Sequence, residues 1–239
     1  MLDEFKKFYK DYLKRFSSQK SSYVIIKYAM TLDGKIASKT GNSKWITSKK
    51  AREWTHNLRA NVDGILVGIN TILKDNPTLT SHGKGKNPVR VVIDPNLRIP
   101  LESNVLNNTA PKVVIYSIEK PRKILQLKKR KVILIKLKSS KGEIHFRDIL
   151  DALRKISVYK VLIEGGGETI WRAIASNYVD EIVTFISPKI VGGKKAITPV
   201  EGLGVEKIND SIKTKILEIK KIGPDILIRS KVKKKSSNR

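Results

Sequence analysis

The sequence has no cysteine and only three histidines, His56, His82 and His145. The absence of cysteine excludes disulfide bonds, thiol catalysis and cysteine-ligated zinc. The histidines are well separated and show no HExxH-type spacing, so the sequence predicts no metal site. No run of 18 apolar residues is present to cross a membrane, and the chain is charged from residue 3, unlike a secretory signal. A cytoplasmic protein is the simplest interpretation.

Acidic residues are scarce, because 22 Asp and Glu stand against 49 Lys and Arg, which gives a formal net charge of +27. Such an excess attracts anions, including nucleic acid, anionic lipid and phosphorylated metabolites. The basic residues are spread along the chain, and no helix-turn-helix, RNA-recognition or zinc-finger motif accompanies them. We therefore favour a phosphate-rich small substrate over a specific nucleic-acid partner, and a basic RNA- or DNA-binding protein is the alternative.

The hydrophobic pattern divides the chain into three parts. Residues 1–22 predict an amphipathic helix followed by a short linker. Residues 23–232 alternate strands with helices, which predicts one α/β domain with a mostly parallel sheet. Within it, residues 208–220 and 226–232 alternate apolar and polar side chains, as an antiparallel hairpin at the edge of a sheet does. Residues 233–239 predict a basic, disordered tail.

A glycine triplet, Gly165-Gly166-Gly167, lies between the apolar strand 161–163 and a helix from Glu168. Free N–H groups and the helix dipole at such a position favour an anion such as a diphosphate. Glycine also lets a ligand approach the backbone closely. Glu164 ends the strand at the same place, where a carboxylate can hold sugar hydroxyls. A tight strand-to-helix turn without a ligand is the alternative interpretation.

A second strand, residues 62–68, also stops at a glycine and is followed by a short helix that contains Thr71 and Asp75. We expect the two strand ends to face each other as walls of one cleft. Lys27 interrupts the apolar strand 23–28, and for a lone lysine we favour a side chain that snorkels to the sheet end over one that points into a site. Arg59 lies in the last turn of a predicted helix, where a surface arginine that compensates the dipole is the simpler interpretation.

Five motifs occur in one order: MTLDGKI (30–36), WITS (45–48) with LRA (58–60), DGILVGINTILKDNPTLT (63–80), LIEGGGET (162–169) and PKIVGG (188–193). Together they resemble the riboflavin-biosynthesis reductases, above all the stand-alone archaeal members, over residues 23–232. The resemblance implies a dihydrofolate-reductase-like three-layer α/β fold with a mostly parallel central sheet. It also implies a homodimer, with NADPH as hydride donor and NADH as a second possible donor.

The activity implied by the resemblance is the reduction of the ribosyl C1′ of 2,5-diamino-6-ribosylamino-4(3H)-pyrimidinone 5′-phosphate to the ribitylamino product. Bacterial relatives fuse this reductase to a zinc deaminase, whose metal needs His and Cys ligands. Because this chain has no cysteine, it cannot deaminate, and we expect it to act on the diamino pyrimidine directly.

The resemblance also implies roles for individual residues. The residues that the resemblance implies as contacts of the nicotinamide cofactor are Met30, Trp45, Thr47, Gly68, Thr71, Asp75, Asp94, Pro95, Gly165, Gly166, Gly167, Glu168 and Thr169. Contacts to the substrate fall to Lys27, Ser43, Arg59, Leu79, His82 and Glu164, and His82 stands where bacterial relatives place an arginine near the substrate phosphate. For catalysis we expect Lys27, Asp75 and Glu164 to steer protons and orient hydroxyls.

Two further alternatives keep the same fold. A dihydrofolate or pterin reductase would share the sheet and NADPH without needing Arg59 and Glu164. A binding module would hold the cofactor and turn nothing over. Turnover of the pyrimidine phosphate against dihydrofolate separates these alternatives.

Overall fold

The computed structural model describes residues 21–107, 110–140 and 142–234. Their elements, in chain order, are β1 (Tyr23–Thr31), α2 (Lys49–Ala60), β2 (Gly64–Gly68), α3 (Ile69–Asp75), β3 (Val89–Ile93), η1 (Asn104–Leu106), β4 (Lys112–Tyr116), α4 (Pro121–Lys129), β5 (Ile133–Lys136), α5 (Phe146–Arg154), β6 (Lys160–Glu164), α6 (Gly167–Ala175), β7 (Glu181–Ser187), η2 (Ile208–Asp210), β8 (Thr214–Ile222) and β9 (Asp225–Val232). The amphipathic helix predicted in residues 1–20 and the tail residues 235–239 lie outside the described residues.

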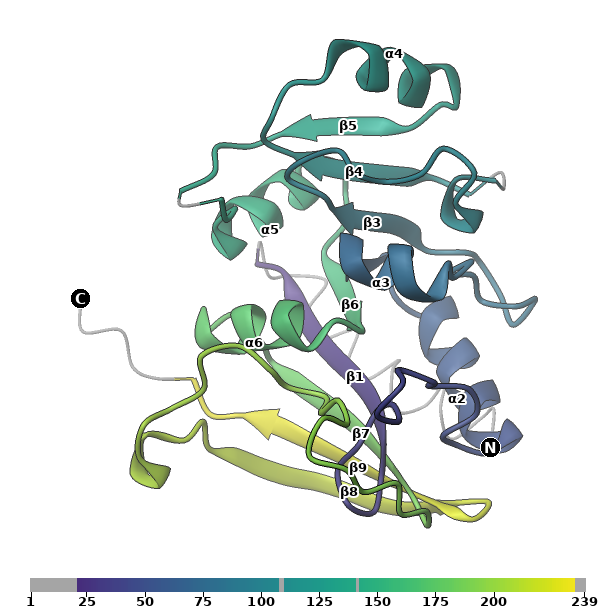
Figure 1. The fold of residues 1–239 in the computed structure, drawn as a ribbon, viewed down its shortest axis with the longest axis vertical. Helices are drawn as coiled ribbons and strands as arrows, with labels where there is room; N and C mark the ends of the chain where they lie inside the picture. Colours follow the sequence, from purple (N-terminus) through teal and green to yellow (C-terminus); the bar gives the residue numbers. More distant parts are fainter. Residues whose placement is uncertain (1–20, 108–109, 141, 235–239) are drawn as a thin grey trace.

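The strands form one nine-stranded sheet in the order β5-β4-β3-β2-β6-β1-β7-β9-β8 (Figure 1). The first seven strands in this order, from β5 at the edge through to β7, pair in parallel with their neighbours. Strand β9 runs antiparallel to both β7 and β8. The mostly parallel sheet with an antiparallel C-terminal hairpin is therefore confirmed. Long connections between parallel strands bring the helices onto the sheet faces, as this topology requires.

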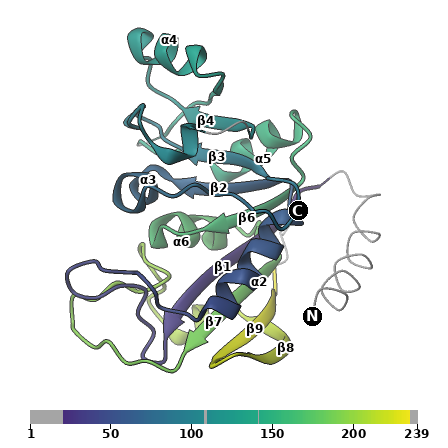
Figure 2. The same ribbon diagram turned by 90° about the vertical axis from the view of Figure 1, so that its right-hand side faces the viewer.

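Helices cover both faces of the sheet, which gives three layers (Figures 1 and 2). Successive residues of a strand point to opposite faces, so Ile25 packs with α2 and α3 whereas its neighbour Ile26 packs with α5 and α6. Leu127 of α4 joins the same core cluster as Ile25. Because both faces of β1 are covered, residues 23–30 of this strand form an apolar run that Lys27 interrupts.

The C-terminal hairpin is held by a buried ion pair. The guanidinium of Arg229 on β9 lies 2.6 Å from the carboxylate of Glu181 on β7, and both side chains are almost fully buried. The hydroxyl of Tyr23 on β1 donates to the same carboxylate at 3.0 Å. Glu218 on β8 lies 3.2 Å from Arg229 and extends the cluster to the edge strand. The four side chains thus link the antiparallel strands to the parallel part of the sheet.

Two predicted boundaries were wrong. Residues 208–210 form a short 3-10 helix instead of the start of a strand, and β8 begins only at Thr214. The physical reason is the turn-forming run after Ile208, in which the backbone N–H of Ser211 donates to the carbonyl of Ile208 at 3.1 Å. The apolar spacing of residues 146–157 predicts one helix over that whole stretch, but α5 stops at Arg154, three residues short, because Ser157 adopts a left-handed φ of 60° that no helix can contain.

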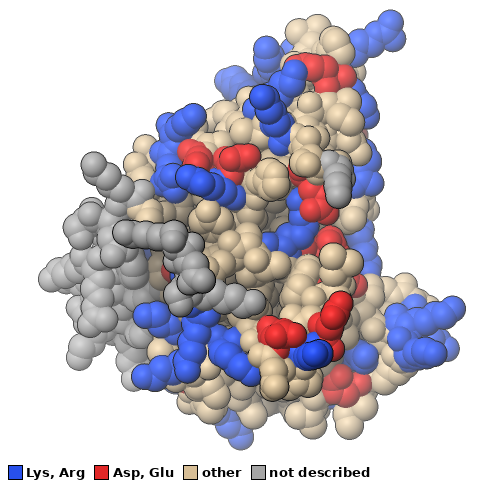
Figure 3. Space-filling view, turned by 90° about the vertical axis from the view of Figure 1, so that its left-hand side faces the viewer, with Lys and Arg blue, Asp and Glu red and all other residues tan. Residues whose placement is uncertain are grey.

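Lysine and arginine side chains are scattered over the face shown in Figure 3, with acidic side chains between them. In the described part of the chain, no helix has the length and apolar character needed to span a membrane. Nor do its residues gather three or more His, Cys, Asp or Glu side chains that could hold a metal ion.

Candidate active site

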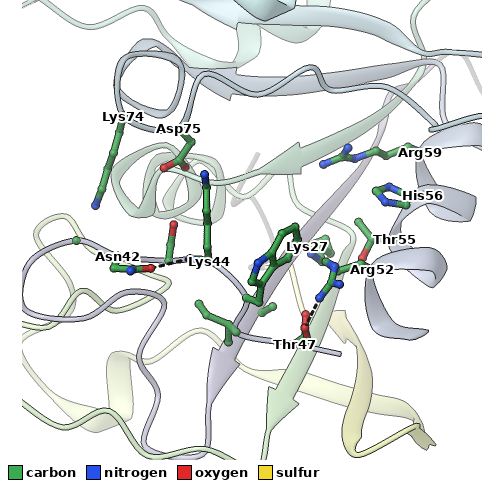
Figure 4. A pocket seen from close by; sticks show the side chains of 15 residues that line it. Lys27, Asn42, Lys44, Thr47, Arg52, Thr55, His56, Arg59, Lys74 and Asp75 are labelled. Carbon is green, nitrogen blue, oxygen red and sulfur yellow. Dashed lines mark hydrogen bonds between the residues drawn. The ribbon is translucent and has the colours of Figure 1, made fainter. Parts of the chain in front are cut away.

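A cavity of about 650 Å³ opens beside the carboxyl-terminal half of β1. Its walls come from β1, from the loop 41–47, from one face of α2 and from the end of α3 (Figure 4). Six side chains predicted for the site line it, namely Lys27, Ser43, Trp45, Thr47, Arg59 and Asp75. Ligands of α/β proteins bind at this end of parallel strands. The glycine ends of β2 and β6, which we expected as the walls of the cleft, do not line this cavity.

An ion pair between Arg59 of α2 and Glu164 of β6 closes one end of the cavity. The guanidinium donates twice to the carboxylate, from Nε to Oε1 at 3.0 Å and from Nη2 to Oε2 at 2.6 Å. Its Nη1 donates to the carbonyl of Thr80 at 3.1 Å. Burial by itself raises the pKa of Glu164, but the charge and hydrogen bonds of Arg59, together with the charges of Lys27 and His56, hold that pKa below its usual value. The carboxylate is therefore charged and fixed in orientation at neutral pH.

Lys27 lies beside this pair, because β1 and β6 pair in parallel with Lys27 opposite Glu164. Its Nζ is 5.8 Å from the ring centroid of Phe185. Burial lowers the pKa of Lys27, and the nearby Glu164 carboxylate opposes that shift only in part. Lys27 lines the cavity, so the snorkelling interpretation is wrong. Its amine releases a proton more readily than that of a surface lysine.

The loop 41–47 and the start of α2 form a second wall. The guanidinium of Arg52 stacks 4.2 Å from the ring centroid of Trp45, whose side chain is 64% exposed. Nη1 of Arg52 also donates to the carbonyl of Thr47 at 2.7 Å, and the adjacent Ser48 caps the helix. These contacts fix a wide aromatic surface at the entrance of the cavity.

At the opposite end of the cavity, Lys74 and Asp75 project from the end of α3 (Figure 4). Desolvation raises the pKa of Asp75, and the cations Lys74 and Lys44 oppose the rise. The carboxyl group can therefore gain a proton at a higher pH than an ordinary aspartate.

The glycine triplet lies against the end of β2 and the first turn of α3, which follows β2 directly. A Cβ atom added to Gly68 would come 2.5 Å from the hydroxyl of Thr169, and one added to Gly166 would come 3.3 Å from the hydroxyl of Thr71. Gly165 and Gly166 both adopt left-handed φ values, 85° and 77°. Glycine is therefore required here twice over, by the backbone conformation and by the close approach of the two turns.

Gly167 differs from its two neighbours because the loop after β7 covers it. A Cβ added there would come 2.6 Å from the side chain of Glu201, and the backbone N–H of Glu201 donates to the carbonyl of Gly167 at 3.3 Å. Within the triplet, Gly165 and Gly166 are therefore the glycines that lie next to Thr71 in the first turn of α3.

The other predicted residues do not line the cavity. Asp94 is fully buried, and its Oδ2 accepts from the backbone N–H of Ile99 at 2.7 Å, so its carboxylate serves the turn that includes Pro95. Leu79 is buried, with a left-handed φ of 53°. Met30 is half-buried on β1, and Glu168 is exposed in the first turn of α6. His82 is exposed and stacks on His56.

Sequence reasoning missed several residues of the cavity wall, among them Arg52, Thr55 and His56 of α2. A helical signal for them exists, because residues 52, 55, 56 and 59 are spaced three and four apart and so share one face of the helix with Arg59. Asn42, Lys44 and Lys74 also line the cavity, and the irregular loop around the first two carries no comparable spacing signal.

Fold and site together define the class, an α/β protein with a mostly parallel sheet and a cavity beside the carboxyl-terminal half of β1 that is lined by several cations. A model of the RibD C-terminal domain matches residues 22–228, and the chain belongs to this family.

Two curated relatives illustrate the range of the family. The riboflavin biosynthesis protein RibD of Aquifex aeolicus is 35% identical over 215 residues, which cover 89% of this chain and 58% of that protein. The 2,5-diamino-6-ribosylamino-4(3H)-pyrimidinone 5′-phosphate reductase of Methanothermobacter thermautotrophicus is 36% identical over 216 residues, which cover 88% of this chain and 98% of that protein. The chain thus spans little more than half the length of the RibD relative.

Among solved structures, RibD of Acinetobacter baumannii superposes with a TM-score of 0.80 at 24% identity, over 95% of this chain and 62% of that one. The likeness shows that the fold is shared.

Proposed function

We propose that this chain is an NAD(P)H-dependent pyrimidine reductase of riboflavin biosynthesis. Its substrate is 2,5-diamino-6-ribosylamino-4(3H)-pyrimidinone 5′-phosphate, and its product carries a ribitylamino chain. The reductase of Methanothermobacter thermautotrophicus, which this chain matches over 98% of its length, supports the proposal by its name. The observation that carries it is the Arg59–Glu164 pair, which lies between the cavity and the glycine turns, where a ribose must meet a cofactor.

The glycine turns fit the diphosphate of a nicotinamide dinucleotide. Gly165 and Gly166 lead directly into the N-terminus of α6, and the hydroxyls of Thr71 and Thr169 lie close beside Gly166, so backbone N–H groups and two hydroxyls are gathered at this point. A diphosphate needs such donors and the positive end of a helix. The nicotinamide would lie in the cavity near Thr47 and Trp45, beside β1.

When bound, the reduced nicotinamide supplies the hydride that the ribosyl C1′ receives. As the bond from C1′ to the ring oxygen breaks, that oxygen takes a proton and C1′ becomes electrophilic. Lys27 is suited to give this proton because burial lowers its pKa. Glu164, held by two hydrogen bonds from Arg59, orients the sugar by accepting from its hydroxyls. Asp75, with its raised pKa, is the second group that can carry a proton.

Product analysis tests the proposal. Incubation of the protein with NADPH and the pyrimidine phosphate should yield a product heavier by two hydrogen atoms, measured by mass spectrometry. Dihydrofolate serves as the control substrate, because the rival dihydrofolate reductase would reduce it and leave the pyrimidine unchanged. Cofactor binding without reduction of either compound would indicate a binding module instead.

We further propose a homodimer. Strand β8 is the edge of the sheet and pairs only with β9 among the described strands, and it exposes Ile216, Leu217 and Ile219. Exposed apolar side chains on an edge strand favour association. Light scattering should give twice the mass of the chain, and Ile219→Lys should reduce it to the monomer mass. A monomeric wild type would contradict this proposal.

A further inference from the structure

The N-terminus of α6 has no cap from its own N-cap residue. That residue is Gly166, which has no side chain to form a cap hydrogen bond. The first N–H groups of a helix have no partner within the helix, and the helix dipole makes this end positive. The start of α6 therefore favours an anion, and the proposed function assigns this place to the diphosphate of the cofactor.

A carboxylate of the same chain already lies at this place. Glu201 belongs to the loop after β7, which runs beside α6 (Figure 1). A Cβ atom added to Gly167, the first residue of α6, would come 2.6 Å from Oε2 of Glu201 and 2.6 Å from its Cγ. Among the described residues, no cation forms an ion pair with Glu201. The positive end of α6 is therefore what favours the carboxylate in this position.

The side chain of Glu201 can leave this position while the loop stays docked. The backbone N–H of Glu201 donates to the carbonyl of Gly167 at 3.3 Å. On one side of it, the carbonyl of Ile197 accepts from the N–H of Ile36 at 2.8 Å. On the other side, a Cβ added to Gly202 would come 2.1 Å from Cδ1 of Trp171, so this glycine packs closely on α6. Glu201 itself is exposed, and its side chain can swing into solvent with little loss of buried surface.

We propose that Glu201 is an intramolecular competitor of the cofactor. Its carboxylate occupies the anion site at the start of α6 in the free protein, and the diphosphate of the cofactor displaces it. The inference rests on the proposed function, since the diphosphate belongs to that cofactor. The reduced and the oxidised cofactor carry the same diphosphate, so the competitor lowers the affinity for both and favours release of the oxidised form after each turnover.

Competition within the chain has a kinetic signature. The cofactor binds only the fraction of the protein in which the site is open, so the competitor lowers the apparent association rate constant. The dissociation rate constant is unchanged, because the carboxylate is absent from the site in the complex. A carboxylate that stayed in place and repelled the bound diphosphate would instead raise the dissociation rate constant.

Stopped-flow binding of NADPH to a charge-neutral variant tests the inference. Glu201→Gln keeps the size of the side chain and removes its charge. We expect NADPH to associate about 2- to 30-fold faster, the factor that corresponds to the stabilisation of a carboxylate at a helix N-terminus, and to dissociate at the wild-type rate.

Glu206→Gln is the matched control. Glu206 is an exposed glutamate of the same loop, so this variant changes the net charge of the protein by the same amount. Both of its rate constants should stay near the wild-type values. Equal association rates in Glu201→Gln and Glu206→Gln, or a change confined to dissociation, would overturn the inference.

Gly167→Ala moves the carboxylate without removing it. The added Cβ lies too close to the Glu201 side chain, which has to swing aside, and alanine adopts the helical backbone of α6 readily. In this background Glu201→Gln should no longer change the association rate, because the carboxylate has already left the site. The same gain in both backgrounds would show that the charge acts from elsewhere and would contradict the inference.

The inference and the proposed function fail separately when inorganic pyrophosphate is the probe, because calorimetry of its binding needs no turnover. If Glu201→Gln tightens pyrophosphate binding about 2- to 30-fold while the pyrimidine is not reduced, Glu201 stands as the competitor of an anion and the reductase proposal falls. If the pyrimidine is reduced while Glu201→Gln binds NADPH as the wild type does, only the role of Glu201 falls.

Discussion

Gly166→Val is the sharpest test of the proposed diphosphate site. The residue has a left-handed φ of 77°, so any side chain there costs about 1–2 kcal/mol in backbone strain. A Cβ would also lie 3.2 Å from the hydroxyl of Thr169 and 3.3 Å from that of Thr71, and the two valine methyl groups extend further into the same space. The backbone is then closed to an anion, which loses a charge-assisted hydrogen bond worth about 1.5–3 kcal/mol. We expect NADPH to bind about 10- to 150-fold more weakly.

Gly142→Val is the matched control. Its φ of 79° imposes nearly the same strain, but no atom lies within 4 Å of an added Cβ. Gly142→Val should therefore lose only the stability that backbone strain costs and keep the wild-type NADPH affinity in a fluorescence titration, whereas Gly166→Val should lose more stability and also NADPH affinity. Equal NADPH affinity in Gly166→Val and the wild type would refute the assignment of the glycine turn to the diphosphate.

Three other perturbations address the substrate site and the fold. Glu164→Gln removes the carboxylate that Arg59 orients, so kcat/KM for the pyrimidine phosphate should fall about 10- to 150-fold with an unchanged Kd for NADPH, and a parallel loss of NADPH binding would contradict its role. Lys27 has a lowered pKa, so its protonated amine disappears as the pH rises through that pKa. We expect kcat to fall over the same pH range. A kcat that does not change with pH would exclude Lys27 as the proton donor. Arg229→Ala leaves the carboxylate of Glu181 buried without its guanidinium partner. Urea denaturation should show that the free energy of unfolding falls by about 3–5 kcal/mol. A loss below about 1 kcal/mol would show that water compensates the buried charge.

The acid dependence of stability follows from the lowered pKa of Glu164. An acid whose pKa is lower in the folded protein stabilises the fold above its unfolded pKa. This contribution is lost as pH falls through the folded pKa, because the unfolded chain then no longer binds more protons than the folded one. The Arg59–Glu164 pair should therefore hold at neutral pH and weaken only below the usual range of a glutamate.

The sequence predicted the parts of the molecule that depend on local patterns. Strand β6 and the glycine turn after it both follow from an apolar run and a glycine triplet within a few residues. The antiparallel hairpin was predicted too, although its first strand was placed six residues early because Ile208 and Ile212 continue the even-numbered apolar positions of the strand. Turn chemistry at Asn209 to Ser211 overrides that alternation.

Contacts between distant segments were beyond local patterns. The partners of the Arg59–Glu164 pair are 105 residues apart, and the packing of α2 in the same core cluster as Leu162 of β6 brings them together. The family resemblance implied that Arg59 and Glu164 both contact the substrate, but it did not predict the ion pair between them. The cover of Gly167 by Glu201 depends on an irregular loop and had no sequence signal. The place of His56 in the cavity wall, by contrast, could have been predicted from the sequence, because His56 shares a helical face with Arg59.

Transfer of deuterium from NADPH labelled at the nicotinamide C4 tests the central claim most directly. The protein is incubated with the labelled cofactor and 2,5-diamino-6-ribosylamino-4(3H)-pyrimidinone 5′-phosphate, and the product is analysed by NMR. The proposed reaction places deuterium on C1′ of the ribityl chain. Oxidation of the cofactor without deuterium at C1′, or reduction of dihydrofolate in place of the pyrimidine, would contradict it.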